Sequence, residues 1–382
     1  MTTQLRFDLL ARDSATMARR GRLHFAHGIV DTPAFMPVGT QATVKTLDPE
    51  EVRGSGAQIL LANTYHLYLR PGHERVRRLG GLHKFMGWDR PILTDSGGYQ
   101  IFSLARLTKV DDDGAVFQSH LDGSKHRFDP ELATRVQLAL GVDVLMALDT
   151  LTPYPAEHAR ARADMLRTTA WARRCAEVWR AERTAANHLF AIVQGGLYPD
   201  LRAESAAALA ELDLPGYAIG GLAVGEPLEE AMDVLEQTTP HLPDGKPRYL
   251  MGVGRPEDLI EGIARGVDMF DCVLPTRNAR KGTVFTSRGK LVVKNAAYAD
   301  DERPLDPDCD CPVCARFTRA YLRHLFASRE ILGLRLATLH SLHYYQRLMR
   351  DARGAIEAGR FPAWRRAALE GLSTGPREQE RN

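Results

Sequence analysis

Short apolar segments that recur along the chain constrain its fold more than any other feature of the sequence. A polar residue or a glycine ends most of them, and stretches with helical periodicity usually separate one from the next. The apolar segments lie at 29–38, 58–63, 92–95, 142–149, 189–194, 217–221, 249–253 and 267–271. The helical stretches lie at 130–140, 156–182, 200–211, 228–238 and 256–265.

This alternation predicts a parallel sheet. Near-continuous apolar strands are typical of a parallel sheet that is covered on both faces. Each helical stretch is long enough to cross from one parallel strand to the next. Eight strands that alternate with helices predict an α/β fold, a (β/α)8 TIM barrel. A doubly wound open sheet is the alternative, but the sequence lacks the glycine-rich dinucleotide fingerprint that usually follows its first strand.

Composition and charge set further limits. The chain has 382 residues, of which 44% are apolar and 26% charged, so a large core is possible and global disorder is excluded. The formal net charge is only +2, yet residues 272–350 hold fourteen Lys and Arg against seven Asp and Glu. On charge alone a solvated face explains this basic region better than a polyanion contact does. The start of the chain lacks a signal-peptide pattern and no apolar run approaches ~18 residues, so we expect a cytoplasmic protein.

Three cysteines, Cys309, Cys311 and Cys314, form the sharpest local signal. Cysteines this close cannot readily bridge one another without strain, and such a cluster usually binds metal. Zinc takes four ligands in a tetrahedron, so one more is needed. The candidates are His324, His340 and His343, with Asp308 and Asp310 as weaker ones. His340 is favoured because it lies in an apolar helical pattern, and four protein ligands would make the zinc structural.

The regular alternation ends after Asp271, which suggests a second part of the chain. Short strands are expected at 283–286 and 291–294, and helices at 316–328 and 338–358. We therefore predict barrel strands and helices with N-terminal elements over 1–282 and a zinc-binding subdomain over 283–350. A final barrel helix is expected over 351–372, and a disordered tail over 373–382, which has almost no apolar content.

The reactive residues of a barrel sit where its strands end. The predicted strand ends carry Asn63, Asp95, Asp149, Gln194, Gly221, Met251 and Asp271. Each acid has a structural explanation by itself: Asp95 and Asp149 could cap helices, and Asp271 could pair with Arg277 or Arg280. All of them at equivalent strand ends are better explained by one shared site.

Glycine pairs follow the same strand ends. They are Gly97-Gly98, Gly195-Gly196 and Gly220-Gly221. Ordinary tight turns explain any one pair, but glycine also lets the backbone approach a ligand closely. Carboxylates, a carboxamide and free backbone groups suit the edge of a purine. Since no metal-ligand pattern joins the three acids, they indicate cleavage at an anomeric carbon, with one acid as nucleophile and another as proton carrier.

With these residues identified, the chain closely resembles the bacterial tRNA-guanine transglycosylases, over roughly residues 7–358. The matching motifs are Asp95-Ser-Gly-Gly-Tyr-Gln100, Val193-Gln-Gly-Gly196, Gly220-Gly-Leu-Ala-Val-Gly-Glu226, Asp271-Cys-Val-Leu-Pro-Thr-Arg-Asn278, and the three cysteines with His340. The resemblance implies a (β/α)8 barrel with a zinc subdomain and a homodimer.

The resemblance also implies roles. Asp271 would be the nucleophile that attacks C1′ of the target guanosine, and Asp95 the general acid/base. The expected base-binding residues are Asp149, Gln194, Gly221 and Leu222 at the purine edge, Ser96 beside Asp149, Tyr99 and Met251 on the faces of the ring, Glu226 under the Leu222–Ala223 peptide, and Asn63 beside Asp95.

The implied substrate is the anticodon wobble position, 34, of GUN-anticodon tRNAs (the Asp, Asn, His and Tyr types), where guanine is exchanged for the queuosine precursor preQ1. Unpaired loop bases are cheap to extract and are read by stacking and edge contacts. Arg277, Arg280, Lys281 and the basic stretch 316–329 would grip tRNA phosphates. One departure from the family pattern is Thr150-Leu151, where bacterial members typically carry Glu-Cys. Val224 matches the bulky residue typical of members that use preQ1, whereas relatives that accept the larger queuine have a smaller residue there, so the resemblance favours preQ1.

Other functions stay open at this stage. A non-catalytic tRNA-binding subunit should lack the nucleophile, and Asp271 is present. An archaeal-type enzyme would carry further RNA-binding domains, and a variant could use a different 7-deazaguanine. An unrelated barrel could bind a phosphate-bearing cofactor at Gly252-Val-Gly254, although Glu257 and Asp258 would repel the anion.

Overall fold

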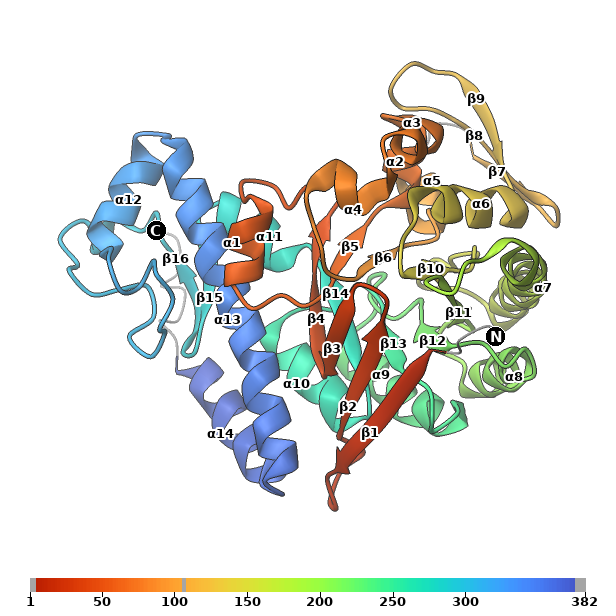
Figure 1. Ribbon diagram of the computed structural model, residues 1–382. Helices are drawn as coiled ribbons and strands as arrows, with labels where there is room; N and C mark the ends of the chain where they lie inside the picture. Colours follow the sequence, from red (N-terminus) through yellow and green to blue (C-terminus); the bar gives the residue numbers. More distant parts are fainter. Residues whose placement is uncertain (1–4, 105–107, 375–382) are drawn as a thin grey trace.

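The computed structural model describes residues 5–104 and 108–374 and contains a closed barrel of eight parallel strands (Figure 1). In order around the barrel the strands are β4 (Ala34–Gly39), β5 (Leu60–Ala62), β6 (Ile92–Thr94), β10 (Val144–Met146), β11 (His188–Val193), β12 (Gly216–Ile219), β13 (Arg248–Leu250) and β14 (Met269–Cys272). β14 pairs with β4 and closes the ring. The predicted TIM barrel is confirmed.

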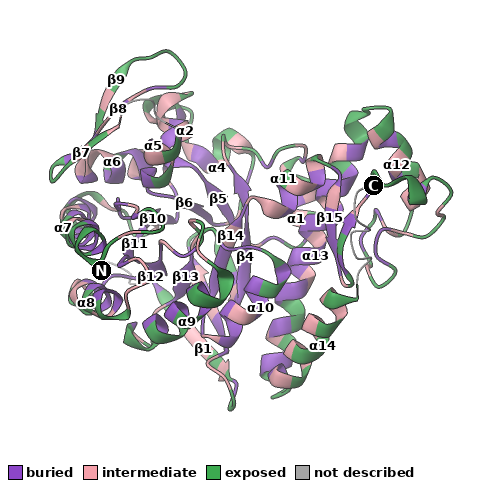
Figure 2. Cartoon of the chain, turned by 180° about the vertical axis from the view of Figure 1, so that it is seen from behind, coloured by how far each residue is buried: buried purple, intermediate pink, exposed green. Residues whose placement is uncertain are grey.

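Helices cover the outside of the barrel. They are α1 (Pro49–Gly54), α2 (Thr64–Leu69), α3 (His73–Arg78), α4 (Gly81–Met86), α5 (Gly98–Leu104), α6 (Pro130–Leu140), α7 (His158–Glu182), α8 (Pro199–Ala210), α9 (Leu228–Thr238), α10 (Pro256–Ala264) and α11 (Leu274–Arg280), with the 3-10 turn η1 (Thr239–His241). Figure 2 shows the barrel strands buried and the outer helix faces exposed. α6 matches its prediction because both ends carry strong signals, a capping Asp129 and a left-handed Gly141.

The predicted first strand, 29–38, is wrong as a single element. Residues 29–32 belong to β3 (Gly28–Thr32), and β4 begins only at Ala34, after Pro33. β3 is the edge of an antiparallel sheet with β1 (Arg6–Arg12) and β2 (Arg19–Phe25) that the sequence did not reveal. Its apolar side chains, such as Leu23 and Val30, pack with barrel-interior residues such as Met36 and so close one end of the barrel.

Two histidines and one aspartate attach this sheet to the barrel. Asp143, fully buried just before β10, accepts hydrogen bonds from His27 of the β2–β3 turn at 2.9 Å and from His83 of α4 at 3.1 Å. The two imidazole rings stack at 3.7 Å with an interplanar angle of 18°. The three residues therefore form a hydrogen-bonded clasp at the N-terminal end of the strands, and we refer to them as the clasp.

A third sheet stands beside α6 at the opposite end of the barrel (Figure 1). It is antiparallel and consists of β7 (Lys109–Asp111), β8 (Gly114–Gln118) and β9 (Lys125–Phe128). The hydroxyl groups of Tyr65 and Tyr68 on α2 hydrogen-bond to His120 in the β8–β9 turn and to His126 on β9, at 2.9 and 3.0 Å. This insertion was also not predicted.

The C-terminal part lies to one side of the barrel (Figure 1). It contains β15 (Thr283–Thr286), β16 (Gly289–Val292), η2 (Ala296–Tyr298), α12 (Arg319–Ala327), α13 (Ile331–Glu357) and α14 (Phe361–Ser373). α13 packs against β15 and α12 as well as against β4 and α11, so one helix joins both parts. The predicted boundary at residue 350 falls within α13, and the division at 282, 350 and 372 remains a proposal. Apart from Ser373 and Thr374, the predicted tail lies outside the described residues.

Within the described ranges we find no helix with the length and hydropathy that a membrane crossing requires.

Candidate active site and metal centre

Asp95 follows β6 and is held by the start of α2. The Asn63 amide donates to one carboxylate oxygen, and the backbone N–H of Thr64 donates to the other at 2.8 Å. Burial raises the pKa of Asp95 to about 7, against the hydrogen bonds from Asn63 and Thr64, and the nearby charge of Asp271 raises it further. The carboxyl group can therefore both accept and donate a proton near neutral pH.

Asp149 follows β10 and forms a buried pair with Gln194, which follows β11. Gln194 donates its amide Nε2 to Asp149 at 2.9 Å, and the Ser96 hydroxyl donates to the other oxygen at 2.8 Å. Burial raises the pKa of Asp149 despite these bonds. The carbonyl oxygen of Gln194 is buried without a hydrogen-bond partner in the described residues. A buried polar atom of this kind costs free energy unless a ligand or water completes its bonding.

The glycine pairs have a more specific purpose than the sequence suggested. A Cβ on Gly98 would lie 2.8 Å from the backbone oxygen of Asp149, and one on Gly220 would lie 2.8 Å from Nε2 of Gln194. Any larger residue would displace these two side chains. Gly98 and Gly220 thus make room for Asp149 and Gln194, and the predicted close approach of the backbone to a ligand stays a prediction.

Asp271, on β14, is fixed by two donors. The Tyr249 hydroxyl donates to its carboxylate at 2.6 Å, and the backbone N–H of Gly252 donates to the same oxygen at 2.8 Å. Burial raises the pKa of Asp271, and these two bonds oppose the rise. In the described part of the chain neither Arg277 nor Arg280 forms an ion pair with Asp271, so the alternative explanation as a structural ion pair is not supported.

The sequence did not reveal the roles of Tyr249 and Thr64, and for Gly252 it offered only a phosphate-binding turn, which Glu257 and Asp258 disfavoured. The only signal for Tyr249 was its place at the start of an apolar segment, which does not show that its hydroxyl reaches the next strand. The amide of Gly252 is used instead to hold Asp271.

The remaining predicted base-binding residues differ in how far they are buried and in what they contact. Tyr99 on α5 is 56% exposed, whereas Leu222 is buried and Met251 packs with the barrel-interior cluster. Glu226 accepts a hydrogen bond from the backbone N–H of Val224 at 2.9 Å. Its carboxylate thus holds the loop after Gly221.

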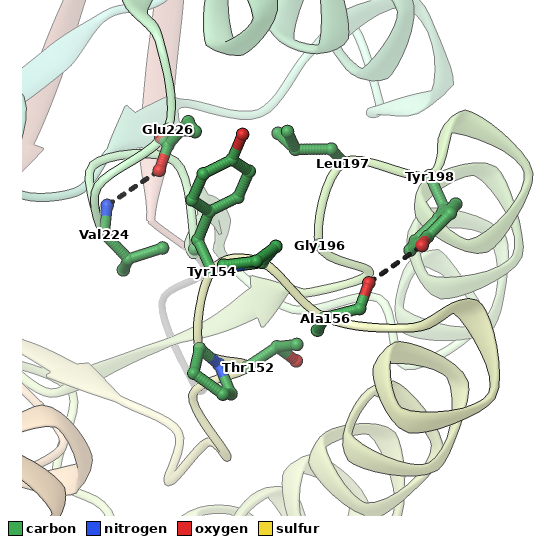
Figure 3. Close-up of a pocket in the computed structure, with 11 residues that line it drawn as sticks. Thr152, Tyr154, Ala156, Gly196, Leu197, Tyr198, Val224 and Glu226 are labelled. Atoms are coloured by element: carbon green, nitrogen blue, oxygen red, sulfur yellow. Dashed lines mark hydrogen bonds between the residues drawn. The ribbon is translucent and has the colours of Figure 1, made fainter.

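A cavity of about 200 Å³ opens beside Gly221 and Glu226 (Figure 3). Tyr154, Leu197 and Val224 also line it. Figure 3 shows the bond between Val224 and Glu226 at one side and a bond between Tyr198 and Ala156 at the other. Neither Thr150 nor Leu151, which replace the family's usual Glu-Cys, lines this cavity.

Cys309, Cys311, Cys314 and His340 converge in the C-terminal part. Nδ1 of His340 lies 3.8, 3.5 and 3.3 Å from the three sulfur atoms. Around a tetrahedral zinc ion the nitrogen and sulfur ligands would be about 3.6 Å apart, so the group fits one metal ion. Nε2 of His340 hydrogen-bonds to the carbonyl of Phe285 at 3.1 Å, which leaves Nδ1 as the metal-binding nitrogen. His343 pairs with Asp310 instead.

The predicted phosphate-binding residues lie close to Asp271 along the chain. Arg277 and Arg280 are on α11, and Lys281 follows it. Arg277 and Lys281 are exposed, and Nη1 of Arg280 has no hydrogen-bond partner in the described residues.

Comparison with known proteins identifies the family. The family model described as "Queuine tRNA-ribosyltransferase" matches residues 13–374. The chain belongs to this family. Its members are tRNA-guanine transglycosylases, which are glycosyltransferases, so the unrelated cofactor-binding barrel considered above is wrong.

Individual relatives agree over almost the whole chain. A queuine tRNA-ribosyltransferase of Pelotomaculum thermopropionicum is 57% identical over 359 residues, which are 94% of this chain and 96% of that protein. One from Moorella thermoacetica is 58% identical over 355 residues, 93% of this chain and 94% of the relative. One from Syntrophobacter fumaroxidans is 56% identical over 361 residues, with 94% and 96% covered.

Proposed function

We propose that this transglycosylase exchanges the guanine at position 34 of GUN-anticodon tRNAs for preQ1, through a covalent link between Asp271 and the RNA. The observation that carries the proposal is the arrangement of three strand-end acids. Asp271 is close enough to Asp95 for its charge to raise the pKa of Asp95. Asp149 accepts a hydrogen bond from Gln194, whose carbonyl oxygen has no hydrogen-bond partner in the described residues.

In the first displacement a carboxylate oxygen of Asp271 attacks C1′ of the target nucleoside. The bond between C1′ and N9 breaks, and its electron pair leaves with the guanine, which receives a proton from Asp95. Tyr249 and Gly252 hold the attacking carboxylate through one oxygen, which leaves the other oxygen free to react.

In the second displacement Asp95 removes the N9 proton of the incoming base. The N9 lone pair attacks C1′, and the bond to Asp271 breaks, which restores its carboxylate. A carboxyl group with a pKa of about 7 suits both transfers because it can give and take a proton at neutral pH. Asn63 would orient it through the amide hydrogen bond.

Base recognition would use the buried pair Asp149 and Gln194, with Ser96 fixing the orientation of Asp149. The backbone of Gly221 and Leu222 would meet the rest of the purine edge, Tyr99 and Met251 would cover the ring faces, and Glu226 would hold the peptide after Leu222. The high exposure of Tyr99 fits a residue that waits for a partner to stack on.

The incoming base would project its 7-substituent toward the cavity beside Gly221. Val224 and Tyr154 restrict that cavity of about 200 Å³, and we therefore favour the small substituent of preQ1. A different 7-deazaguanine is the alternative, because Thr150 and Leu151 replace the Glu-Cys that bacterial members of the family typically carry, although neither residue lines this cavity.

We further propose that the Cys309, Cys311, Cys314 and His340 group holds one zinc ion. Four protein ligands leave no open position, so the ion would stabilise the fold and take no part in the reaction. We also propose that the enzyme is cytoplasmic and forms a homodimer. Arg277, Arg280 and Lys281 would bind the phosphates of the tRNA.

The test is incorporation of labelled guanine into a GUN-anticodon tRNA by the wild type and by Asp271→Ala. We expect incorporation by the wild type and none by the variant. Equal incorporation by both would refute the nucleophile, and a wild type that binds tRNA without exchange would support the non-catalytic subunit. Competition between preQ1 and queuine then decides the incoming base.

A further inference from the structure

Arg202 on α8 is a buried cation that the proposed mechanism does not use. Its side chain is fully buried, and in the described residues it forms no ion pair with a carboxylate. Charged side chains are rarely buried this deeply unless they are paired, because removal from water is costly. Burial lowers the pKa of Arg202 to about 9, against the influence of Glu226, which raises it. Something in its surroundings must offset this cost.

The guanidinium group joins two turns of the candidate site. Nε donates to the carbonyl of Gly196 at 2.7 Å, and Nη2 donates to the carbonyl of Gly220 at 3.0 Å. The first turn follows Gln194, and the second carries Gly221, so one side chain fixes both. The close fit is visible at Gly195, where a Cβ would lie 2.9 Å from the backbone nitrogen of Arg202.

Arg202 also has an N–H group that does not donate a hydrogen bond to any described residue. Within the part of the chain that the structure describes, Nη1 of Arg202 is buried without a hydrogen-bond partner, and so is Oε1 of Gln194. A neutral side chain could tie two carbonyls together without leaving a buried charge. Two unpartnered polar atoms on groups that adjoin the same turns leave hydrogen bonds that a bound ligand or a water molecule would complete.

We propose that Arg202 is a positioning residue for recognition of the purine edge, acting through the turns at Gly196 and Gly220. The inference rests on the proposed function, since it concerns the same base site. It assigns Arg202 no contact with the reacting atoms. Loss of the two hydrogen bonds would let the turns move, so Gln194 and the Gly221 backbone would meet the base less well. Asp271 would be unaffected, because Tyr249 and Gly252 hold it independently.

The experiment compares Arg202→Lys and Arg202→Met in guanine exchange and in calorimetric guanine binding. Lysine can keep one of the two carbonyl bonds, whereas methionine keeps neither. We expect KM for guanine to rise about tenfold in Arg202→Lys and further in Arg202→Met, as for the loss of one and two charged hydrogen bonds. The kcat at saturating guanine should fall less than KM rises.

Arg248→Lys is the matched control. Arg248 is likewise buried and donates to a backbone carbonyl, that of Leu242 at 3.2 Å, but it lies on the first residue of β13, away from the site. The Arg248→Lys variant should have a lower melting temperature than the wild type and an unchanged KM for guanine. If Arg202→Met does not fold, Arg202→Lys decides alone. An unchanged KM in Arg202→Lys, or an equal rise in Arg248→Lys, would overturn the inference, whereas a wild type without exchange would overturn the proposed function.

Discussion

At the scale of single residues, the surroundings of two carboxyl groups, Asp95 and Asp271, set how readily each one holds a proton. Asp95 is held near a pKa of about 7 by burial, against the hydrogen bonds from Asn63 and Thr64. Asp271 has a pKa raised by burial but opposed by Tyr249 and Gly252. One acid is thus suited to proton transfer, and the other is supported as an anion that can attack.

Replacement of Asn63 by alanine should move the acidic limb of the pH profile. The amide stabilises the charged form of Asp95, so its loss raises the pKa of that group. A hydrogen bond to a charged group contributes roughly 1.5 kcal/mol, which corresponds to a shift of about one pH unit toward higher pH. The measurement is kcat/KM for the incoming base from pH 5 to 9.

Asn187→Ala provides the comparison, because that amide is also buried but donates to Val142 before β10, at the N-terminal end of the strands. Coincident acidic limbs for wild type and Asn63→Ala would remove Asp95 from the role of proton carrier.

At the scale of elements, the sheet formed by β1, β2 and β3 depends on the clasp. Burial, the largest influence, raises the pKa of Asp143, but hydrogen bonds from His27, His83 and the backbone of Ile92 lower it to about 2. The unfolded value is about 3.9, so the ionised group stabilises the fold above pH ~4 and this stabilisation is lost as pH falls toward 2.

Asp143→Asn should therefore lower the free energy of unfolding at pH 7 by about 2 kcal/mol. The difference from the wild type should shrink as the pH falls from 4 to 2. Urea unfolding at pH 7, 4 and 3 measures it, with the exposed Asp89→Asn as a control. A difference that stays constant over this range would show that the clasp does not act through the charge of Asp143.

The C-terminal part should depend on its metal. Cys311 lies in the same cluster as Leu305, Val313 and Leu322, so the sulfur ligands are part of that core. We expect about one zinc per chain in the wild type and almost none in Cys309→Ser, with a melting temperature lower by at least ~5 °C. Cys175→Ser, which removes a buried thiol outside the group, should keep the zinc. Full zinc content in Cys309→Ser would contradict the ligand assignment.

Elements were predictable from the sequence where local signals and burial agree. α6 and α9 match their predicted bounds, and the barrel follows from the apolar strands. The sheets β1–β3 and β7–β9 were not predicted, because β1, β2 and β9 are rich in charged residues and lack a continuous apolar run. Among the site residues, strand-end acids could be found from position alone. The roles of Tyr249, Thr64 and Arg202 could not, since they depend on which neighbouring strand or turn a side chain reaches.

At the scale of the whole molecule, we propose that the exposed basic residues Arg277 and Lys281, which follow Asp271 along the chain, bind tRNA phosphates beside the site. Arg277→Ala with Lys281→Ala should weaken tRNA binding and reduce its salt dependence by about two counterions, with guanine binding unchanged. Titrations at several salt concentrations measure this, and Lys84→Ala, exposed on α4 near the clasp, is the control. An unchanged salt dependence in the double variant would place the RNA elsewhere.

The most direct measurement of the central claim is the site of covalent attachment. Wild-type protein is incubated with labelled GUN-anticodon tRNA, denatured and digested, and the peptide that retains the nucleotide is identified by mass spectrometry. We predict a nucleotide linked through C1′ to the carboxylate of Asp271, released when guanine is added before denaturation. Attachment at Asp95, Asp149 or any other residue would contradict this assignment. It would also be contradicted if both the wild type and Asp271→Ala exchanged guanine and neither protein gave a nucleotide-linked peptide.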